Sequence, residues 1–226
     1  MSKSKFNVIN PDDVIARYGT DCFRMYEMFL GPIQQSKPWD TKGIDGISKF
    51  LRKYFNLFAN EDGSLKLTDD APTKDELKVL HQTIKKVSGD IEELSFNTAV
   101  SSFMICVNEL KKLNCNKRQI LEPLNVLLSP FAPFLTEELW EAMGNETSIH
   151  LGEYPVHDDQ HLVSDTVEYP VCINGKKRSQ FTIDSNSDQD TIKSEALALE
   201  AIQKYIEGKE IKKVIVVPKR MVNIVV

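Results

Sequence analysis

The sequence of 226 residues lacks any run of about 18 consecutive apolar residues, the length that a membrane-spanning helix needs. Its first residues, MSKSKFNVINPDD, lack the apolar core and the small-residue cleavage site of a secretory signal. Cysteine is scarce: the four cysteines are dispersed and include no C-x-x-C pair, which suits a reducing compartment and argues against a zinc site. We therefore expect a cytoplasmic protein with no membrane partner and no bound metal.

Histidine is equally scarce, with four residues in the chain. Only His157 and His161 are close in sequence, and Gly152 and Pro155 before them indicate a loop instead of the helical spacing of a ligand pair. We expect solvated loop histidines here, which agrees with the absence of a metal site.

The composition is that of a globular protein, with 41% hydrophobic and 8% aromatic residues, and the length allows one or two domains. The net charge of −5 gives no overall sign of nucleic-acid binding. The charge is unevenly placed, however: residues 1–37 carry +1, residues 38–164 carry −7 and residues 165–226 carry +1. Clusters of basic residues therefore stand out near the two ends of the chain.

The first part of the chain predicts two short helices. Asn10 is a suitable N-cap, Pro11 suits the first helical position, and Gly19 ends the helix. A second helix is expected over residues 20–30, with Gly31 directly after it.

Residues 42–144 have a helical period almost throughout, which predicts a bundle of four or five helices. Thr73 and Glu76 form the pattern of a capping box at the start of one of them, and another is expected to begin at Asn97. The segment 120–143 is predicted to be broken by its prolines. Aromatic residues on the periodic face are expected to pack in the core and not to stack on bases; they are Tyr54, Phe55 and Phe58.

Residues 145–165 show no sustained period and are expected to be a linker with at most local packing. After them, alternating apolar residues flank Asn174 and Gly175, a hairpin turn signal. One helix, capped by Ser187 and ended by Gly208, should precede two further strands. The predicted fold is mainly α with a small α+β C-terminal domain in the order strand, strand, helix, strand, strand.

The first five residues, MSKSK, contain the last four letters of K-M-S-K-S, the signature loop of class I aminoacyl-tRNA synthetases. The continuation resembles the segment that follows this loop in leucyl-tRNA synthetases of the bacterial type. It includes NVINPD at residues 7–12, RYGTD at 17–21 and R-x-Y-x-x-F-x-GP at 24–32. Further similarities extend to the end of the chain: SKPW at 36–39, FNTA at 96–99, LSPFAP at 128–133, V-x-INGK at 171–176 with Arg178, and KVIVVP at 213–218 through VNIV at 222–225.

This resemblance implies a division of the chain into modules. Residues 1–37 are similar to the end of the signature loop with a stem-contact subdomain, and residues 38–150 to an anticodon-binding-type helical bundle. Residues 151–164 then form a linker, and residues 165–226 a small α+β domain that contacts tRNA. We expect the chain to be monomeric.

For a parent enzyme, the resemblance implies ATP-dependent activation of leucine and its transfer to tRNA(Leu). Lys3 is the expected catalytic residue, because a cationic loop beside the triphosphate stabilises charge that builds on departing pyrophosphate. ATP, bound with Mg²⁺, is the implied cofactor. Its expected contacts in the signature loop are Met1, Ser2, Lys3 and Ser4.

Two departures from the family pattern stand at the start of the chain. No lysine precedes Met1, which suggests a piece of a longer chain, and Phe6 replaces the Gly or Asn of many family members. The H-I-G-H element of a nucleotide-binding half and an editing domain are also missing from the 226 residues. We therefore expect this chain to be catalytically inactive by itself.

Basic residues supply the candidates for contact with tRNA, because phosphate attraction gives them a use there. In the last domain they are Lys176, Lys177, Arg178, Lys212, Lys213, Lys219 and Arg220. In the bundle they are Arg52, Lys53, Lys85 and Lys86. For the bundle pairs a solvated surface charge is the stronger alternative, whereas the two hairpin loops of the last domain favour a binding role.

Two other interpretations remain open. The chain could belong to a valyl, isoleucyl or methionyl relative, against which the small α+β domain with its N-G-K-x-R turn argues. It could also be a helical interaction module with no catalytic parent. Nothing in the composition or spacing of the chain identifies leucine as the amino acid, so that expectation depends entirely on the resemblance.

Overall fold

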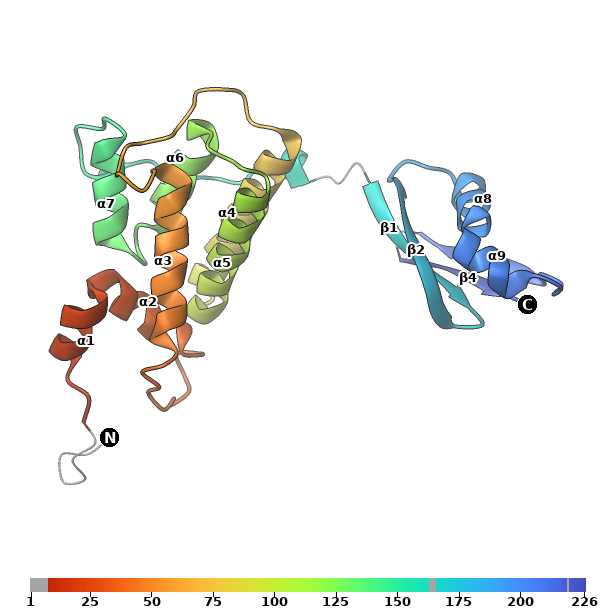
Figure 1. Ribbon diagram of the computed structural model, residues 1–226, viewed down its shortest axis with the longest axis horizontal. Coiled ribbons are helices and arrows are strands. Elements are labelled where there is room, and N and C mark those ends of the chain that lie inside the picture. Colours follow the sequence, from red (N-terminus) through yellow and green to blue (C-terminus); the bar gives the residue numbers. More distant parts are fainter. Residues whose placement is uncertain (1–7, 163–165, 219) are drawn as a thin grey trace. The chain divides into compact units, whose positions relative to one another are not determined.

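The structure, a computed structural model, describes residues 8–162, 166–218 and 220–226 (Figure 1). Contacts within the chain separate it into two compact units, Met1–Leu162 and Val163–Val226, each with its own hydrophobic core. Across the described residues, none of the helices combines the length and apolar character of a membrane span. Nor do these residues include a group of three or more His, Cys, Asp or Glu side chains placed to hold a metal ion.

The first unit begins with two short helices, α1 (Pro11–Tyr18) and α2 (Thr20–Phe29). The Asn10 side chain accepts a hydrogen bond from the Asp12 amide at 3.2 Å, so the predicted N-cap is confirmed. Gly19 has a φ of +87°, a conformation that side chains disfavour, and it turns the chain between the two helices. The α2 carboxylate of Asp21 accepts hydrogen bonds from the amides of Phe134 and Leu135, which ties this pair of helices to the later bundle.

Five further helices build the bundle around one core, as the sequence period predicts (Figure 1). They are α3 (Ile44–Phe58), α4 (Lys74–Glu92), α5 (Phe96–Lys112), α6 (Arg118–Leu128) and α7 (Pro133–Ala142). The capping box of Thr73 and Glu76 is present at the start of α4, with both reciprocal hydrogen bonds made. Burial of apolar side chains along these faces therefore stabilises the unit, at roughly 25 cal/mol per Å² of apolar surface.

The predicted packing role of the bundle aromatics is confirmed for Tyr54 and Phe58, which are fully buried. The Tyr54 hydroxyl donates to Asn125 Oδ1 at 3.0 Å, and Asn125 Nδ2 donates to the Thr136 carbonyl at 2.8 Å. These bonds satisfy the buried polar groups and link α3, α6 and α7 in the middle of the core.

The expectation that Pro123 breaks the chain's helical path is wrong. Pro123 lies inside α6, and the break comes instead between α6 and α7, where Pro130 and Pro133 stand. A proline in a helix interior costs about 3 kcal/mol because it removes one backbone hydrogen bond and crowds the preceding turn. Seven of the eleven residues of α6 are buried, and this packing offsets that cost.

Residues 145–162, where the sequence indicates a linker, run along the bundle and contact it at several points. The short helices η2 (Ile149–Leu151) and η3 (Asp159–Leu162) lie within this stretch. Ile149 is 1% exposed, and Trp140 Nε1 donates to the Thr147 carbonyl at 2.7 Å. Further along, the Asp158 amide donates to His81 Nδ1 of α4 at 3.0 Å. The stretch from 145 to 162 is therefore part of the helical unit, and the two units divide after Leu162.

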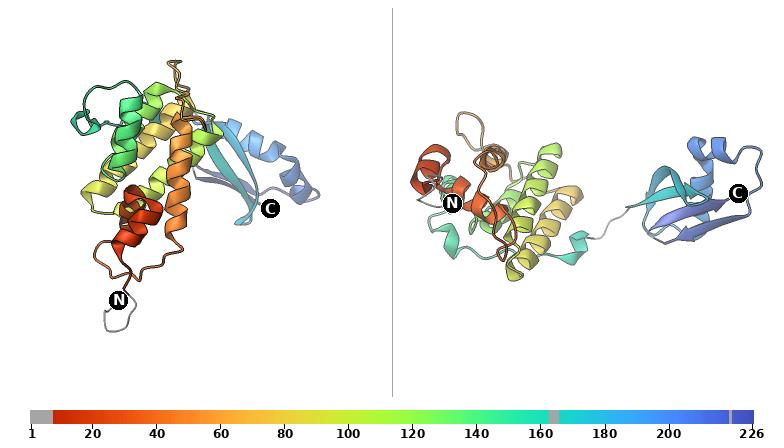
Figure 2. Two further views of the ribbon diagram at one scale, coloured as in Figure 1. Left: turned by 60° about the vertical axis from the view of Figure 1, so that its left-hand side comes forward. Right: turned by 90° about the horizontal axis from the view of Figure 1, so that it is seen from below.

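The second unit is a four-stranded mixed sheet with two helices on one face (Figure 2). Its strands are β1 (Thr166–Ile173), β2 (Lys176–Asp184), β3 (Lys213–Val217) and β4 (Met221–Val225), and its helices are α8 (Gln189–Ala198) and α9 (Glu200–Ile206). The sheet order is β2-β1-β4-β3, with β1 parallel to β4 and both hairpins antiparallel. The predicted fold class is thereby confirmed.

Two local details of this unit differ from the prediction. The helix is capped by Asp188, whose side chain accepts from the Thr191 amide at 2.7 Å, and not by Ser187. The helix is also divided, because Leu199 adopts an extended conformation with φ of −62° and ψ of +123°. Leu199 packs against the core of the sheet, and burial of this side chain accompanies the change of helix direction.

Candidate nucleic-acid interface

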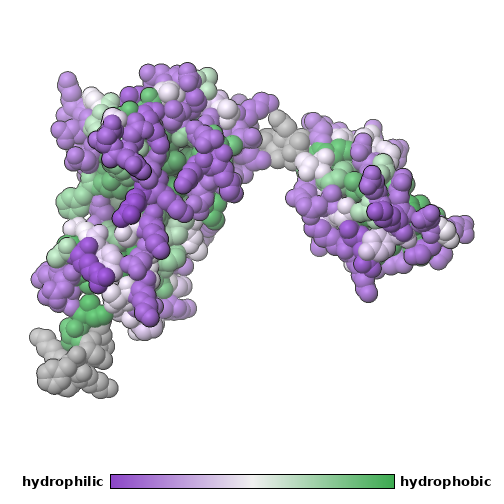
Figure 3. All heavy atoms as spheres, viewed as in Figure 1, coloured by the Kyte–Doolittle hydropathy of each residue, from purple (hydrophilic) through white to green (hydrophobic). Residues whose placement is uncertain are grey.

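The expected signature-loop residues Met1, Ser2, Lys3 and Ser4 lie outside the described residues, as does Lys219. The remaining basic candidates are distributed over both units. Figure 3 shows that hydrophilic side chains cover most of the visible face of each unit. The contacts of each basic side chain therefore decide whether it is available to a partner or already engaged within the protein.

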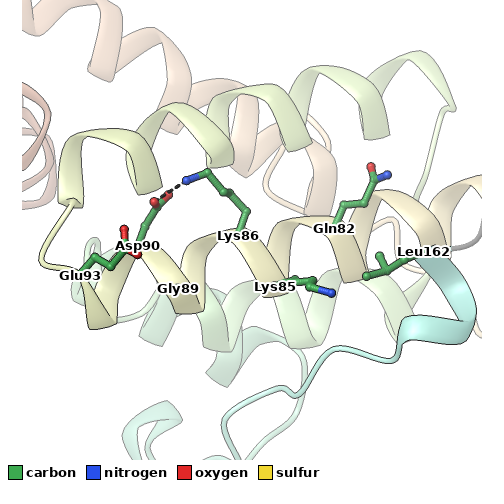
Figure 4. A pocket seen from close by; sticks show the side chains of 7 residues that line it. All are labelled: Gln82, Lys85, Lys86, Gly89, Asp90, Glu93 and Leu162. Carbon is green, nitrogen blue, oxygen red and sulfur yellow. Dashed lines mark hydrogen bonds and ion pairs between the residues drawn. The ribbon is translucent and has the colours of Figure 1, made fainter. Parts of the chain in front are cut away.

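Lys85 and Lys86 of α4 adjoin a surface pocket of about 420 Å³ (Figure 4). Lys85 Nζ lies 2.8 Å from Asp159 Oδ1, in an ion pair exposed to solvent. Lys86 pairs with Asp90, whose side chain is only 2% exposed. The second carboxylate oxygen of Asp90 is buried and has no hydrogen-bond partner among the described residues. Lys86 is therefore the cation that compensates a buried charge.

Arg52 and Lys53 lie on the exposed side of α3. Lys53 Nζ donates to Asn108 Oδ1 of α5 at 3.3 Å. Arg52 borders a shallow apolar pocket with Phe55 and Phe134, and the Phe134 side chain is 66% exposed. The four bundle candidates thus come from two helices and lie beside at least three different pockets.

In the second unit the strand register brings several cations to one end of the sheet. Lys176 pairs with Ile173 across β1 and β2, Ile173 pairs with Ile224, and Lys213 pairs with the next residue, Val225. The turn at this end has positive φ at both of its central residues, Asn174 (+47°) and Gly175 (+81°), as the sequence signal predicts.

This turn is fixed to the neighbouring strand. The Asn174 amide donates to the Ile224 carbonyl at 2.9 Å, and the Gly175 amide donates to Asn223 Oδ1 at 3.0 Å. The Lys212 amide donates to the Val225 carbonyl at 2.9 Å, which holds Lys212 at the same end of the sheet. Lys176, Lys177, Lys212 and Lys213 therefore form one basic edge.

Arg220 lies apart from this edge. Its amide donates to the Val217 carbonyl at 3.1 Å in the turn between β3 and β4, at the opposite end of that hairpin. The two basic loops that the sequence places in one domain thus point to two ends of the β3–β4 hairpin, and one RNA phosphate does not reach both.

Arg178 is positioned by a contact that sequence reasoning missed. Its guanidinium carbon lies 4.5 Å from the centre of the Tyr205 ring of α9, and its Nη1 lies 3.5 Å from the Tyr205 hydroxyl. Periodicity identifies Ile202 and Ile206 as the buried face of this helix but says nothing of the partner of Tyr205. The two residues are 27 positions apart in the sequence, and this separation hides the contact from any local pattern.

Three of the four cysteines have thiols that burial makes less acidic. Burial raises the pKa of the Cys22 thiol to about 11 and that of Cys106 to about 12. Burial likewise raises the pKa of Cys115 to about 12. These three thiols remain protonated at neutral pH, and all four cysteines are buried.

A family model described as the anticodon-binding domain of tRNA ligase matches residues 74–194. A leucine–tRNA ligase of Cytophaga hutchinsonii is 53% identical over 225 residues, which cover 100% of this chain and 24% of the relative. A leucine–tRNA ligase of Bacteroides thetaiotaomicron is 53% identical over 226 residues, with the same two shares.

Among solved structures, a similar chain comes from the ternary complex of an Agrobacterium radiobacter K84 LeuRS with tRNA and LeuAMS. It matches with a TM-score of 0.79 and 27% identity, over 100% of this chain and 31% of the other. The chain thus spans about a quarter of the length of the curated relatives it matches, at 24%.

Proposed function

Because the chain belongs to the family of anticodon-binding domains of tRNA ligases, we propose that it is the tRNA-binding portion of a leucine–tRNA ligase. The observation that carries this proposal is the 53% identity to leucine–tRNA ligases along the whole chain. The partner that this portion binds is tRNA(Leu). Valine, isoleucine and methionine ligases are weaker alternatives, since the relatives reported above are named for leucine.

The distribution of cations in the second unit supports RNA binding there. The basic edge of Lys176, Lys177, Lys212 and Lys213 makes no ion pair within the described part of the chain. When cations without a carboxylate partner meet RNA phosphates, they displace counterions that are condensed on the RNA, and the release of these counterions into solvent drives affinity at low salt. The edge therefore serves as the primary phosphate contact of this unit.

The ligase reaction belongs to the longer protein of which this segment is a part. There ATP and leucine form leucyl-adenylate, and Lys3 stabilises the charge on departing pyrophosphate together with the Ser2 and Ser4 hydroxyls. In a complete ligase containing this segment, Lys3→Ala slows pyrophosphate exchange by about two to three orders of magnitude. Lys5→Ala is the matched control and has a smaller effect. A loss of tenfold or less for Lys3→Ala would contradict the role.

The test of tRNA binding uses the 226-residue chain itself. Its affinity is measured for a leucine-accepting tRNA and for a non-cognate tRNA with a short variable arm, over a salt titration. Preference for the leucine tRNA that survives moderate salt supports the proposal. Equal binding of both RNAs that disappears with salt, or no binding, would show that recognition does not reside in this segment. Size-exclusion chromatography with light scattering tests the accompanying proposal of a monomer.

A further inference from the structure

Arg178 occupies an irregular position in the hairpin of the second unit. Val171 pairs with Ser179, whereas the next residue, Cys172, pairs with Lys177. Arg178 is therefore the extra residue of a β-bulge, opposite no residue of β1. A bulge interrupts the strict alternation of side chains between the two faces of a sheet and re-aims the side chain it contains.

The bulge directs Arg178 toward the helix-covered side of the sheet, where α9 packs beside β2 (Figure 1). There the guanidinium carbon stands 4.5 Å above the centre of the Tyr205 ring. Lys177, one residue earlier, donates instead to Gln180 of its own strand. Two neighbouring cations are thus held in different ways, one by an amide oxygen and one by an aromatic face.

The stacked pair remains accessible. Arg178 is exposed, and the Tyr205 side chain is 42% exposed. Within the described residues, Arg178 makes no ion pair with a carboxylate. A guanidinium is planar and weakly hydrated, so a ring on one side leaves a flat cationic surface on the other side.

We propose that Arg178 and Tyr205 form a stacking platform for one unstacked base of the bound RNA. This inference rests on the proposed tRNA-binding function and specifies how one part of that surface works. Proteins recognise splayed-out RNA bases by stacking them on aromatic rings or on guanidinium planes. Nη1 donates to the Tyr205 hydroxyl at 3.5 Å, and the other N–H groups of the guanidinium can donate to a phosphate of the same nucleotide.

The position of the guanidinium over the Tyr205 ring favours a base over a phosphate as the main ligand. A phosphate needs only a positive charge within reach, which the lysines of the basic edge already provide. Placing the guanidinium over a ring requires both a bulge in β2 and an aromatic residue of α9. That arrangement matters to a ligand that stacks on the guanidinium plane. A lysine in place of Arg178 would keep the positive charge but would have no planar group.

The test therefore replaces the planar guanidinium with a group of the same charge that is not planar. Arg178→Lys should weaken binding of leucine-accepting tRNA by about 5- to 100-fold, the effect of removing one stacking contact. The slope of log affinity against log salt should stay unchanged, since the number of cations is the same. Equal affinity of Arg178→Lys and wild type at every salt concentration would overturn the platform, as would a loss of affinity that comes with a smaller slope.

Tyr205 provides the second half of the test. Tyr205→Leu removes the ring and should weaken binding to a similar extent, whereas Tyr205→Phe keeps the ring and should retain wild-type affinity within about threefold. Wild-type affinity of Tyr205→Leu would overturn the proposal. Amide NMR spectra establish that each variant of the second unit is folded before its affinity is compared.

Lys193→Arg is the control, because it also exchanges one cation for another and because Lys193, in the same unit, already pairs with Asp190 at 2.8 Å. This exchange should leave both affinity and slope unchanged, and a loss equal to that of Arg178→Lys would contradict a specific platform. Failure of the wild-type chain to bind any tRNA would instead overturn the proposed function itself. Binding by wild type without a difference in Arg178→Lys overturns the platform alone.

Discussion

The two units treat their basic residues differently. In the described part of the helical unit, five lysines and arginines are paired with carboxylates from the same helix or a neighbouring segment, whereas others, such as Arg52 and Lys53, make no such ion pair. These pairs include Lys85 with Asp159, Lys86 with Asp90, Lys112 with Glu109, Lys117 with Asp70 and Arg118 with Asp69. In the described residues of the second unit, Lys193 with Asp190 is the ion pair that forms. Basic residues of the two units thus differ in their availability to an RNA.

This difference follows the distribution of charge along the chain. Residues 38–164 carry a net charge of −7, so a cation there has carboxylates close by, whereas residues 165–226 carry +1. A paired lysine gains less from a phosphate, because it first gives up a partner. The number of basic residues in a segment is therefore a poorer guide to RNA binding than the partners of each basic residue.

The largest effect is expected when three cations of the second unit are neutralised, and a matched set of three cations in the helical unit provides the comparison. Replacing Lys176, Lys177 and Arg178 together by Gln should lower tRNA affinity by roughly two orders of magnitude at 0.1 M salt. The salt slope should fall by about two to three, since each phosphate contact contributes about 0.9. The measurement is a salt titration of fluorescence anisotropy with labelled tRNA.

The matched set in the helical unit is Arg52, Lys53 and Lys85, also replaced by Gln. Its effect on the slope should stay below about one, because Lys85 already pairs with Asp159 and the set lies in the segment 38–164, which carries a net charge of −7. Equal losses from the two sets would break the comparison, and RNA binding would then have to be assigned to both units alike.

Much of this architecture follows from local sequence signals. The cap at Asn10, the capping box of Thr73 and Glu76, and the turn at Asn174 and Gly175 each depend on residues within four positions of one another. Such signals need no knowledge of the rest of the fold, because the hydrogen bonds and backbone angles concerned are local.

The predictions from sequence are wrong where packing between residues distant in the sequence determines the local structure. Pro123 stays helical because the surrounding core holds α6, and the helix of the second unit divides where Leu199 packs into the core of the sheet. The contact of Arg178 with Tyr205 depends on a β-bulge and on the placement of α9, neither of which has a sequence signal. The candidate cations could be nominated from sequence, but their partners could not.

A smaller effect distinguishes the two adjacent lysines of α4. Lys86→Met should lower the free energy of unfolding by about 1–3 kcal/mol, because it leaves the carboxylate of Asp90, 2% exposed, without its cation. Lys85→Met is the control and should change stability less, since its partner Asp159 is 73% exposed. Urea denaturation followed by tryptophan fluorescence measures the helical unit, which contains both tryptophans of the chain, Trp39 and Trp140.

A double variant sharpens this result. Adding Asp90→Leu to Lys86→Met removes the buried charge as well, so most of the lost stability should return. An equal loss in Lys86→Met and Lys85→Met would show that Asp90 does not depend on its cation. The unequal roles assigned to these two neighbours would then be wrong.

The smallest expected effect concerns the segment that closes the helical unit. His81 Nδ1 accepts the Asp158 amide at 3.0 Å, and the rings of His81 and His161 stack with centres 4.5 Å apart. Burial lowers the pKa of His81, the nearby His161 and His157 lower it further, and Asp158 acts in the opposite direction. The neutral imidazole is thus the form that holds this segment on α4.

The direction of the pH effect follows from that preference. When the segment is released, His81 recovers its ordinary pKa of about 6.5 and binds a proton more readily. Docking is therefore fully stable above that pH and weakens as the pH falls through the lower value of the folded state. Amide hydrogen exchange at Asp158 should accelerate between pH 7.5 and 5.5 relative to the intrinsic rate. His81→Leu removes the acceptor, so protection should be low at both values, and an unchanged pH dependence in this variant would assign the effect to His157 or His161.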